Sequence, residues 1–192
     1  MKKLKRAADT YNLLDFIDKD SPQALDECRD VAESLVIRTG EEKNPHWNDS
    51  AEAVIAAMIA VVVMYGQKDK GTRSLQKVRD ILAHPQQFEM AKKLMLENGG
   101  MLARWGGQLE HLKGDELASV MSTCNRHLRF LDTPAIAEST GSSSFDPAAL
   151  RKGTMTVYLV LPPEHMRAQS GLLRVWIGSL LRAVVKGGLK DG

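Results

Sequence analysis

The segment Met155–Leu161 (MTVYLVL) constrains the fold most, because no other stretch of the 192-residue sequence has so clear a pattern of a buried β-strand. Its apolar and β-branched residues are typical of a strand that is covered on both faces. A helix-patterned stretch from about Gln169 to Lys186 follows it, so the two predict one strand–helix unit of an α/β sheet. A single strand cannot satisfy its backbone hydrogen-bonding groups or cover its faces. We therefore expect this unit to be a piece of a larger α/β protein.

The expected strand needs a neighbour. Within the chain, Tyr11–Ile17 (YNLLDFI) is the only other short apolar stretch outside the helical patterns, so it is the favoured pairing partner. Two alternatives remain open. The strand can pair across a two-fold axis with a second copy, or it can be poorly ordered beside a helical part that folds alone.

The residues before this unit have the spacing of packed helices. Apolar side chains recur every three or four positions from Ser21 to about Leu131. The stretch Ala53–Tyr65 is apolar on nearly every side, so we predict that it is a central buried helix. It is shorter than the about 20 residues that a membrane-spanning helix needs.

Pro134 and the loop Ser139–Ser144 (STGSSS) mark a boundary between the helical stretch and the strand–helix unit. The sequence predicts three parts: an N-terminal segment (1–20), an all-α domain (21–132), and a linker with the β-α unit (133–192). The predicted fold class is therefore mainly α. It comprises a helical bundle-like all-α domain and a small α/β remnant of one strand and one long helix.

Motifs that would support catalysis are absent from the sequence. There is no G-x-x-x-x-G-K-[ST] phosphate loop, and no acidic residue that could hold magnesium directly follows Leu161. The five histidines do not pair with one another, or with Cys28 or Cys124, at metal-ligand spacing. Ser143 and Ser144 lie outside any nucleophile elbow. We expect this chain to have no catalytic residues, no metal site and no cofactor, and not to be an enzyme by itself.

One group of side chains is a candidate binding site. Arg126 and Arg129 share the solvent stripe of the amphipathic stretch Asp115–Leu131, and Arg104 and Trp105 lie on the preceding helix. Arginines beside an aromatic ring can grip phosphates and stack on an unpaired base. The alternative is that the arginines form an ordinary solvated face and that Trp105 belongs to the core. The net charge of +2 is too small to indicate a nucleic-acid binder by itself.

Several long strings of the sequence match a known family pattern. They are YNLLDFID (Tyr11–Asp18), HWNDSAEAVIAAMIA (His46–Ala60), SLQKVRDIL (Ser74–Leu82), NRHLRFLDTPAIAEST (Asn125–Thr140), SSSFDP (Ser142–Pro147) and TVYLVLPPEHM (Thr156–Met166). In these strings the chain resembles the coupling-protein ATPases of type IV secretion and conjugation, the TraG type. The resemblance covers almost the whole chain.

The resemblance implies a hexameric parent protein, anchored in the inner membrane, that uses ATP and magnesium in a RecA-like domain. In that family an all-α domain is inserted between the two nucleotide-binding motifs. The chain then corresponds to a cytoplasmic fragment without direct membrane contact. Residues 1–20 and 133–192 would come from the nucleotide-binding domain, and 21–132 would be the inserted domain.

The family's all-α domain is implicated in contacting transferred single-stranded DNA and relaxase or effector cargo. We infer from placement alone that Arg104, Trp105, Arg126 and Arg129 serve this contact. The alternative function is a stand-alone helical protein–protein adaptor. A complete small enzyme is a third reading, which the missing motifs disfavour.

Overall fold

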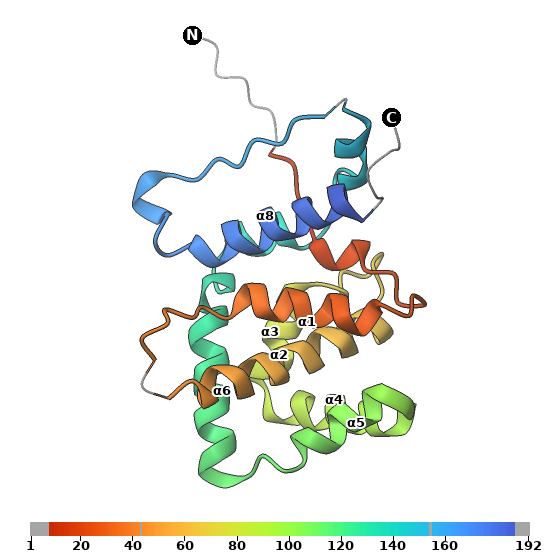
Figure 1. Ribbon diagram of the computed structural model, residues 1–192, viewed down its shortest axis with the longest axis vertical. Coiled ribbons are helices and arrows are strands. Elements are labelled where there is room, and N and C mark those ends of the chain that lie inside the picture. The colour runs from red at the N-terminus through yellow and green to blue at the C-terminus, as the bar shows by residue number, and fades with distance from the viewer. Residues whose placement is uncertain (1–7, 43, 154, 187–192) are drawn as a thin grey trace.

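The computed structural model describes residues 8–42, 44–153 and 155–186. Within these ranges the chain is mainly helical and contains no β-strand (Figure 1). The α-helices are α1 (Ala24–Leu35), α2 (His46–Tyr65), α3 (Leu75–Ala83), α4 (Pro85–Asn98), α5 (Gly100–Leu109), α6 (Gly114–Leu128), α7 (Pro134–Thr140) and α8 (Ser170–Val185). The short 3-10 helices are η1 (Leu13–Phe16), η2 (Arg129–Leu131), η3 (Pro147–Lys152) and η4 (Pro163–His165). The mainly α fold class is thus confirmed.

Helix α2 is the centre of the molecule. Every residue from Val54 to Val63 is buried, and α1, α3, α4, α5 and α6 all pack against the helix. By length and composition alone α2 could cross a membrane, but 67% of its most apolar window is buried among the other helices. Its apolar surface on all sides is therefore explained by helix packing, and the prediction of a central buried helix is confirmed.

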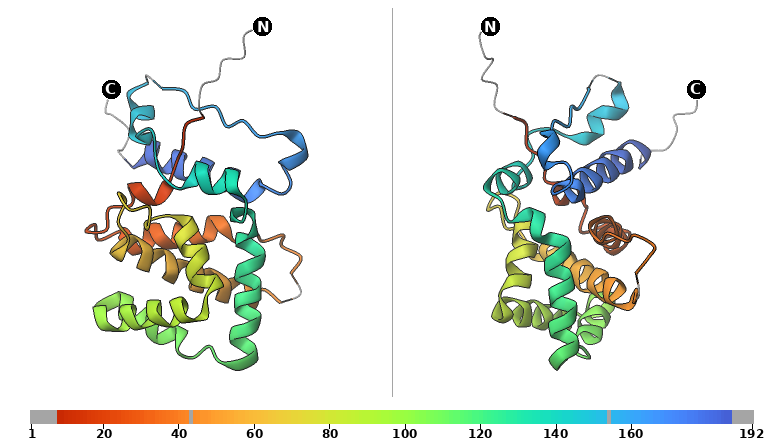
Figure 2. Two further views of the ribbon diagram at one scale, coloured as in Figure 1. Left: turned by 180° about the vertical axis from the view of Figure 1, so that it is seen from behind. Right: turned by 90° about the vertical axis from the view of Figure 1, so that its left-hand side faces the viewer.

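The other helices surround α2 in layers. Helix α1 lies between α2 and α8, the α4–α5 pair covers the far side of α2, and α6 runs along one flank (Figures 1 and 2). Helix α8 also packs against η3 and approaches η2 closely at Gly171. A Cβ at Gly171 would lie 2.9 Å from the Phe130 ring, so this approach requires glycine. The long C-terminal helix is confirmed, with bounds one residue inside the expected ones.

The prediction that Met155–Leu161 forms a β-strand is wrong. The segment is extended but has no ladder partner, and none of its backbone groups has a hydrogen bond within the described residues. Its side chains alternate between half-buried and exposed, so that Tyr158 is 83% and Val160 89% exposed. A strand forms only beside another strand, and the favoured partner is helical here because Leu13–Phe16 forms η1. The predicted α/β remnant is therefore not supported, and only its long helix, α8, is present.

The N-terminal segment instead pairs with the last turn of α7 and the loop after it. The N–H of Tyr11 donates to the carbonyl oxygen of Ser139 at 2.8 Å, and the N–H of Ser144 donates to that of Thr10 at 3.0 Å. The N–H of Asn12 donates to the hydroxyl of Ser143 at 3.0 Å. We call this contact between residues 10–12 and 139–144 the clasp. It places the entry and the exit of the helical part side by side.

The predicted part boundaries at 20/21 and 132/133 stay predictions. Residues 1–7 of the N-terminal part, residue 154 of the linker, and residues 187–192 of the C-terminal part lie outside the described residues.

Candidate functional site

Helix α6 presents the candidate arginines because its two stripes differ in character. Its inner stripe, which includes Val120, Cys124 and Leu128, is buried against neighbouring helices including α2. Acidic residues occupy the first turn and Arg126 lies in the last, which is the favourable arrangement for the helix dipole. Arg129 follows directly in η2. The chain therefore exposes both arginines at the C-terminal end of α6.

A cavity of about 370 Å³ lies at this end of α6. Three parts of the chain line it: the α1–α2 connection with the start of α2, the end of α6 with η2, and the stretch that enters α8. The lining residues are Ile37, Thr39, Glu42, Asn48, Arg126, His127, Arg129, Phe130, Arg167, Ala168, Ser170 and Gly171. Three guanidinium groups and one carboxylate thus border one space, which we call the arginine cavity.

Buried polar side chains fix the orientation of Arg126. Its Nη2 donates to the amide oxygen of Asn48 at 3.0 Å, and Asn48 itself is only 3% exposed. The same oxygen lies 3.0 Å from Nε2 of His127. The backbone N–H of Ile37 donates to Nδ1 of His127 at 3.2 Å, so Nδ1 is the unprotonated nitrogen. Nε2 therefore carries the proton and donates to Asn48.

The surroundings of His127 are strongly cationic. Burial, followed by the positive charges of Arg126, Arg174 and Arg38, lowers the pKa of His127 to about 4. These arginines lie on α6, α8 and the α1–α2 connection. Arg38 is neutralised by Asp49 and Glu52, at 2.9 and 2.7 Å. His127 is therefore neutral at pH 7. Its two ring nitrogens connect the backbone of Ile37 to the side chain of Asn48 in the wall of the cavity.

The low pKa of His127 predicts an acid-sensitive fold. An unfolded histidine has a pKa of about 6.5, so between pH 6.5 and 4 the unfolded chain binds more protons than the folded one. The free energy of unfolding is unaffected by this histidine above about pH 6.5 and falls as the pH drops below that value. By pH 4 the loss is about 1 to 3 kcal/mol. His127→Gln keeps a donor towards Asn48 and does not titrate. Urea denaturation at several pH values should therefore show a smaller loss in the glutamine variant. Identical pH profiles would contradict the buried neutral histidine.

Arg129 and Arg167 differ in their partners from the arginines that form salt bridges. Arg79 and Arg182, like Arg38, each lie within salt-bridge distance of a carboxylate. Within the described part of the chain, neither Arg129 nor Arg167 has such a carboxylate, and both are exposed. Their positive charge is therefore available to an anion from solution.

The structure separates the other two predicted site residues from this cavity. Trp105 is 8% exposed, its ring lies under Arg29 at 4.5 Å, and it lines a different cavity of about 160 Å³. Arg104 is exposed, with a contact to the sulfur of Met101 at 3.5 Å. The core placement of Trp105 thus fits the alternative interpretation. The structure brings Arg126 and Arg129 together. It also adds Asn48 and Arg167, which the sequence did not indicate.

The comparisons with known proteins agree on one family. A family profile described as "Type IV secretory system Conjugative DNA transfer" matches residues 2–188. The chain is 24% identical over 181 residues to the "Probable conjugal transfer protein TraG" of Sinorhizobium fredii, covering 91% of this chain and 28% of that protein. It is 24% identical over 188 residues to the "Conjugal transfer protein TraG" of Escherichia coli, covering 90% of this chain and 29% of that protein.

The "Conjugal transfer protein TraG" of Rhizobium radiobacter is 23% identical over 180 residues, with 91% of this chain and 28% of that protein covered. No solved structure matches the chain. The chain spans less than a third of the length of these curated relatives. Because the family profile covers nearly all of its residues, the chain belongs to the type IV secretory system conjugative DNA transfer family.

Proposed function

We propose that the chain is the cargo-recognition part of a conjugative coupling protein, and that its helical part contacts transferred single-stranded DNA or the relaxase or effector that travels with it. The observation that carries this proposal is the arginine cavity. Arg126 and Arg129 lie side by side along its wall, and Arg129 has no carboxylate partner among the described residues. Family membership supplies the context of DNA transfer.

Exposed, unneutralised guanidinium groups suit a phosphate backbone. Arginine binds phosphate oxygens with two parallel donors, and such contacts do not depend on the base sequence. A transfer protein must accept any sequence that passes it, so contacts of this kind fit the task. Each phosphate neutralised on a single strand releases bound counterions, so affinity should fall steeply with salt.

The parent protein in this proposal is a hexameric ATPase anchored in the inner membrane, with this part on its cytoplasmic side. ATP and magnesium act in regions outside this chain, which has no catalytic role of its own. In the parent, residues 155–161 would add a strand to a RecA-like sheet supplied by the rest of the protein, and α8 would pack against that sheet. The exposure of Tyr158 and Val160, on an extended segment with free backbone groups, supports this assignment.

Charge reversal of both arginines tests the DNA contact. Fluorescence anisotropy with a labelled oligothymidylate should show salt-dependent binding to the wild-type chain. Arg126→Glu with Arg129→Glu should weaken it by at least about 10-fold, because each arginine makes charge-assisted hydrogen bonds to phosphate. The slope of log affinity against log salt should also become shallower, by about 0.7 for each phosphate contact that is lost.

The matched control reverses two exposed lysines away from the cavity, Lys93→Glu and Lys113→Glu, with the same change of net charge. Circular dichroism should be alike in all three proteins. An equal loss of affinity in the lysine control would mean that only net charge matters. Unchanged affinity in the arginine variant would mean that both arginines belong to an ordinary solvated face and do not contact DNA.

A stand-alone helical adaptor is the second candidate, and one observation favours it. Ile177, Leu181 and Val185 form an apolar stripe on the outside of α8, at 47%, 60% and 73% exposure. A stripe of this kind can dock a protein partner. The neighbouring coding sequence separates the two candidates. A phosphate loop encoded upstream and an acidic strand downstream would identify the coupling protein, and genuine start and stop codons would favour the adaptor.

A further inference from the structure

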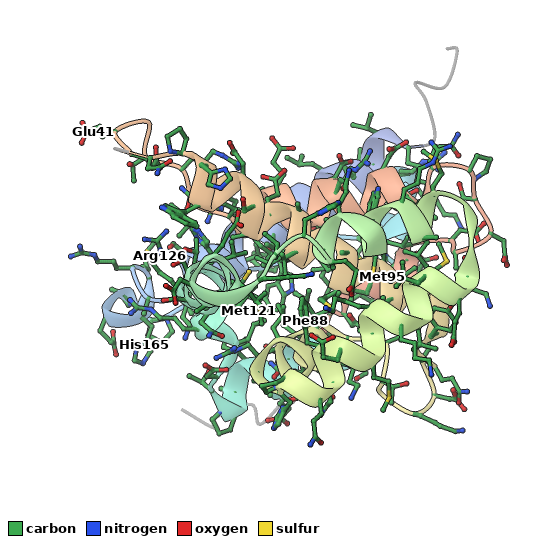
Figure 3. All side chains as sticks on the ribbon, turned by 90° about the horizontal axis from the view of Figure 1, so that it is seen from below. Glu41, Phe88, Met95, Met121, Arg126 and His165 are labelled. Carbon is green, nitrogen blue, oxygen red and sulfur yellow. The ribbon has the colours of Figure 1, made fainter. Side chains whose placement is uncertain are left out.

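The arginine cavity receives its cationic groups from two separate parts of the chain. Arg126 and Arg129 belong to the end of α6 and to η2, whereas Arg167 belongs to the turn between η4 and α8. Figure 3 shows Arg126 and the nearby His165 on the same side of the molecule, away from Met95. Ser170 and Gly171, in the first turn of α8, complete this second side.

The charge inside the cavity is only partly compensated. Glu42 is the one carboxylate among its lining residues, and it already accepts hydrogen bonds from the backbone N–H groups of Thr39 and Gly40. Three guanidinium groups face this single carboxylate. One turn further along α8, Nε of Arg174 is buried and has no hydrogen-bond partner in the described ranges. A buried donor without an acceptor is costly, so this guanidinium group adds to the positive charge beside the cavity that has no partner.

The first turn of α8 adds unpaired donors. The N–H groups of Ser170 and Gly171 have no backbone acceptor among the described residues, as is usual at the start of a helix. Together with the guanidinium groups they offer several N–H donors around one open space. An anion with oxygens on several sides can use donors from both walls, whereas a planar carboxylate has only two oxygens to offer.

We propose that the arginine cavity binds one phosphate group, held on one side by Arg126 and Arg129 and on the other by Arg167 and the start of α8. The bound phosphate fastens α8 to the end of α6. It therefore connects the helical part with the stretch that follows the extended segment. This inference rests on the proposed function to the extent that Arg126 and Arg129 serve both, but Arg167 and the link to α8 are new.

Thermal unfolding of the full chain with inorganic phosphate tests the proposal. At constant ionic strength, set with sodium chloride, phosphate should raise the melting temperature of the wild-type chain in a saturable way. Arg167→Ala removes one wall of the site without touching a buried residue, and it should weaken the apparent phosphate affinity by about 10-fold or more. Lys93→Ala, an exposed residue on α4, is the charge-matched control and should respond like the wild type.

A second readout locates the effect. Phosphate should shift the amide resonances of Ser170 and Gly171 in the wild-type chain, and it should do so far less in Arg167→Ala at the same concentration. Equal stabilisation of the wild type and Arg167→Ala would overturn the proposal, as would the absence of any response to phosphate in the wild type.

Oligonucleotides identify the source of the phosphate. A 5′-phosphorylated oligothymidylate that binds more tightly than its 5′-hydroxyl counterpart would assign the site to a terminal phosphate. Equal affinity, with displacement of both by inorganic phosphate, would assign it to the strand's backbone. DNA binding that is insensitive to phosphate and to Arg167→Ala would sink this inference and leave the proposed function standing. Phosphate binding without DNA binding would contradict the proposed function and leave this inference standing.

Discussion

Replacing Ile59 by aspartate is expected to remove most of the stability of the chain. Ile59 lies in the middle of α2 and is fully buried, in a helix that five others cover. An aspartate there would be ionised without a partner or would have to be protonated, and its neighbours would lose apolar contacts. The expected cost is on the order of 4 to 5 kcal/mol, against a total stability of about 5 to 15 kcal/mol for a typical domain.

Urea denaturation measures this cost, and two variants of the same helix control it. Ile59→Val removes one methylene group and should cost about 0.5 to 1.5 kcal/mol. Ala53→Asp places the same charge on an exposed position of α2 and should cost less than about 1 kcal/mol. If Ile59→Asp cost no more than Ala53→Asp, α2 could not be the centre of the core.

Hydrogen exchange should divide the chain sharply into two classes. The amides of residues 54–63 are hydrogen-bonded within α2 and shielded by other helices, so they should exchange only through large-scale unfolding. The amides of residues 155–161 have no acceptor within the described chain and should exchange almost as in an unfolded peptide. The expected difference is roughly a thousandfold or more.

The exchange experiment also tests the proposal that the segment completes a sheet elsewhere. It should be run at a concentration where the chain is monomeric by sedimentation. Comparable protection of 155–161 and 54–63 in the monomer would mean that the segment is a strand inside this chain. Protection that develops only as the chain concentration rises would indicate pairing between two copies.

The helices could be predicted from the sequence because their signals are local. The all-round apolar pattern of Ala53–Tyr65 indicates burial whatever packs against it, and α6 and α8 show clear periodicity. The strand could not be predicted on the same basis. The pattern of Met155–Leu161 describes what the segment can do beside a partner, and no partner strand lies among the described residues.

The candidate site shows the same division. Spacing on one helix was enough to place Arg126 and Arg129 together, because α6 formed as expected. Asn48 lies 78 positions from Arg126 and reaches it only through the packing of α2 against α6. Arg167 follows a proline turn with no periodic pattern. Periodicity shows that a helix has two faces but not which one a ring occupies, so it could not decide between a base-stacking Trp105 and the core Trp105 that the structure shows.

The clasp has a mechanical consequence. Residues 10–12 and 139–144 join near the two ends of the α1–α7 part of the chain, so tension between these two points loads these hydrogen bonds together with the packing of α8 against α1. The load would pass from Thr10 across to Ser144 without stretching α2 or the helices around it. The helical part can therefore move as a rigid attachment with whatever carries the two flanks, while the clasp and the contacts of α8 with α1 carry the load.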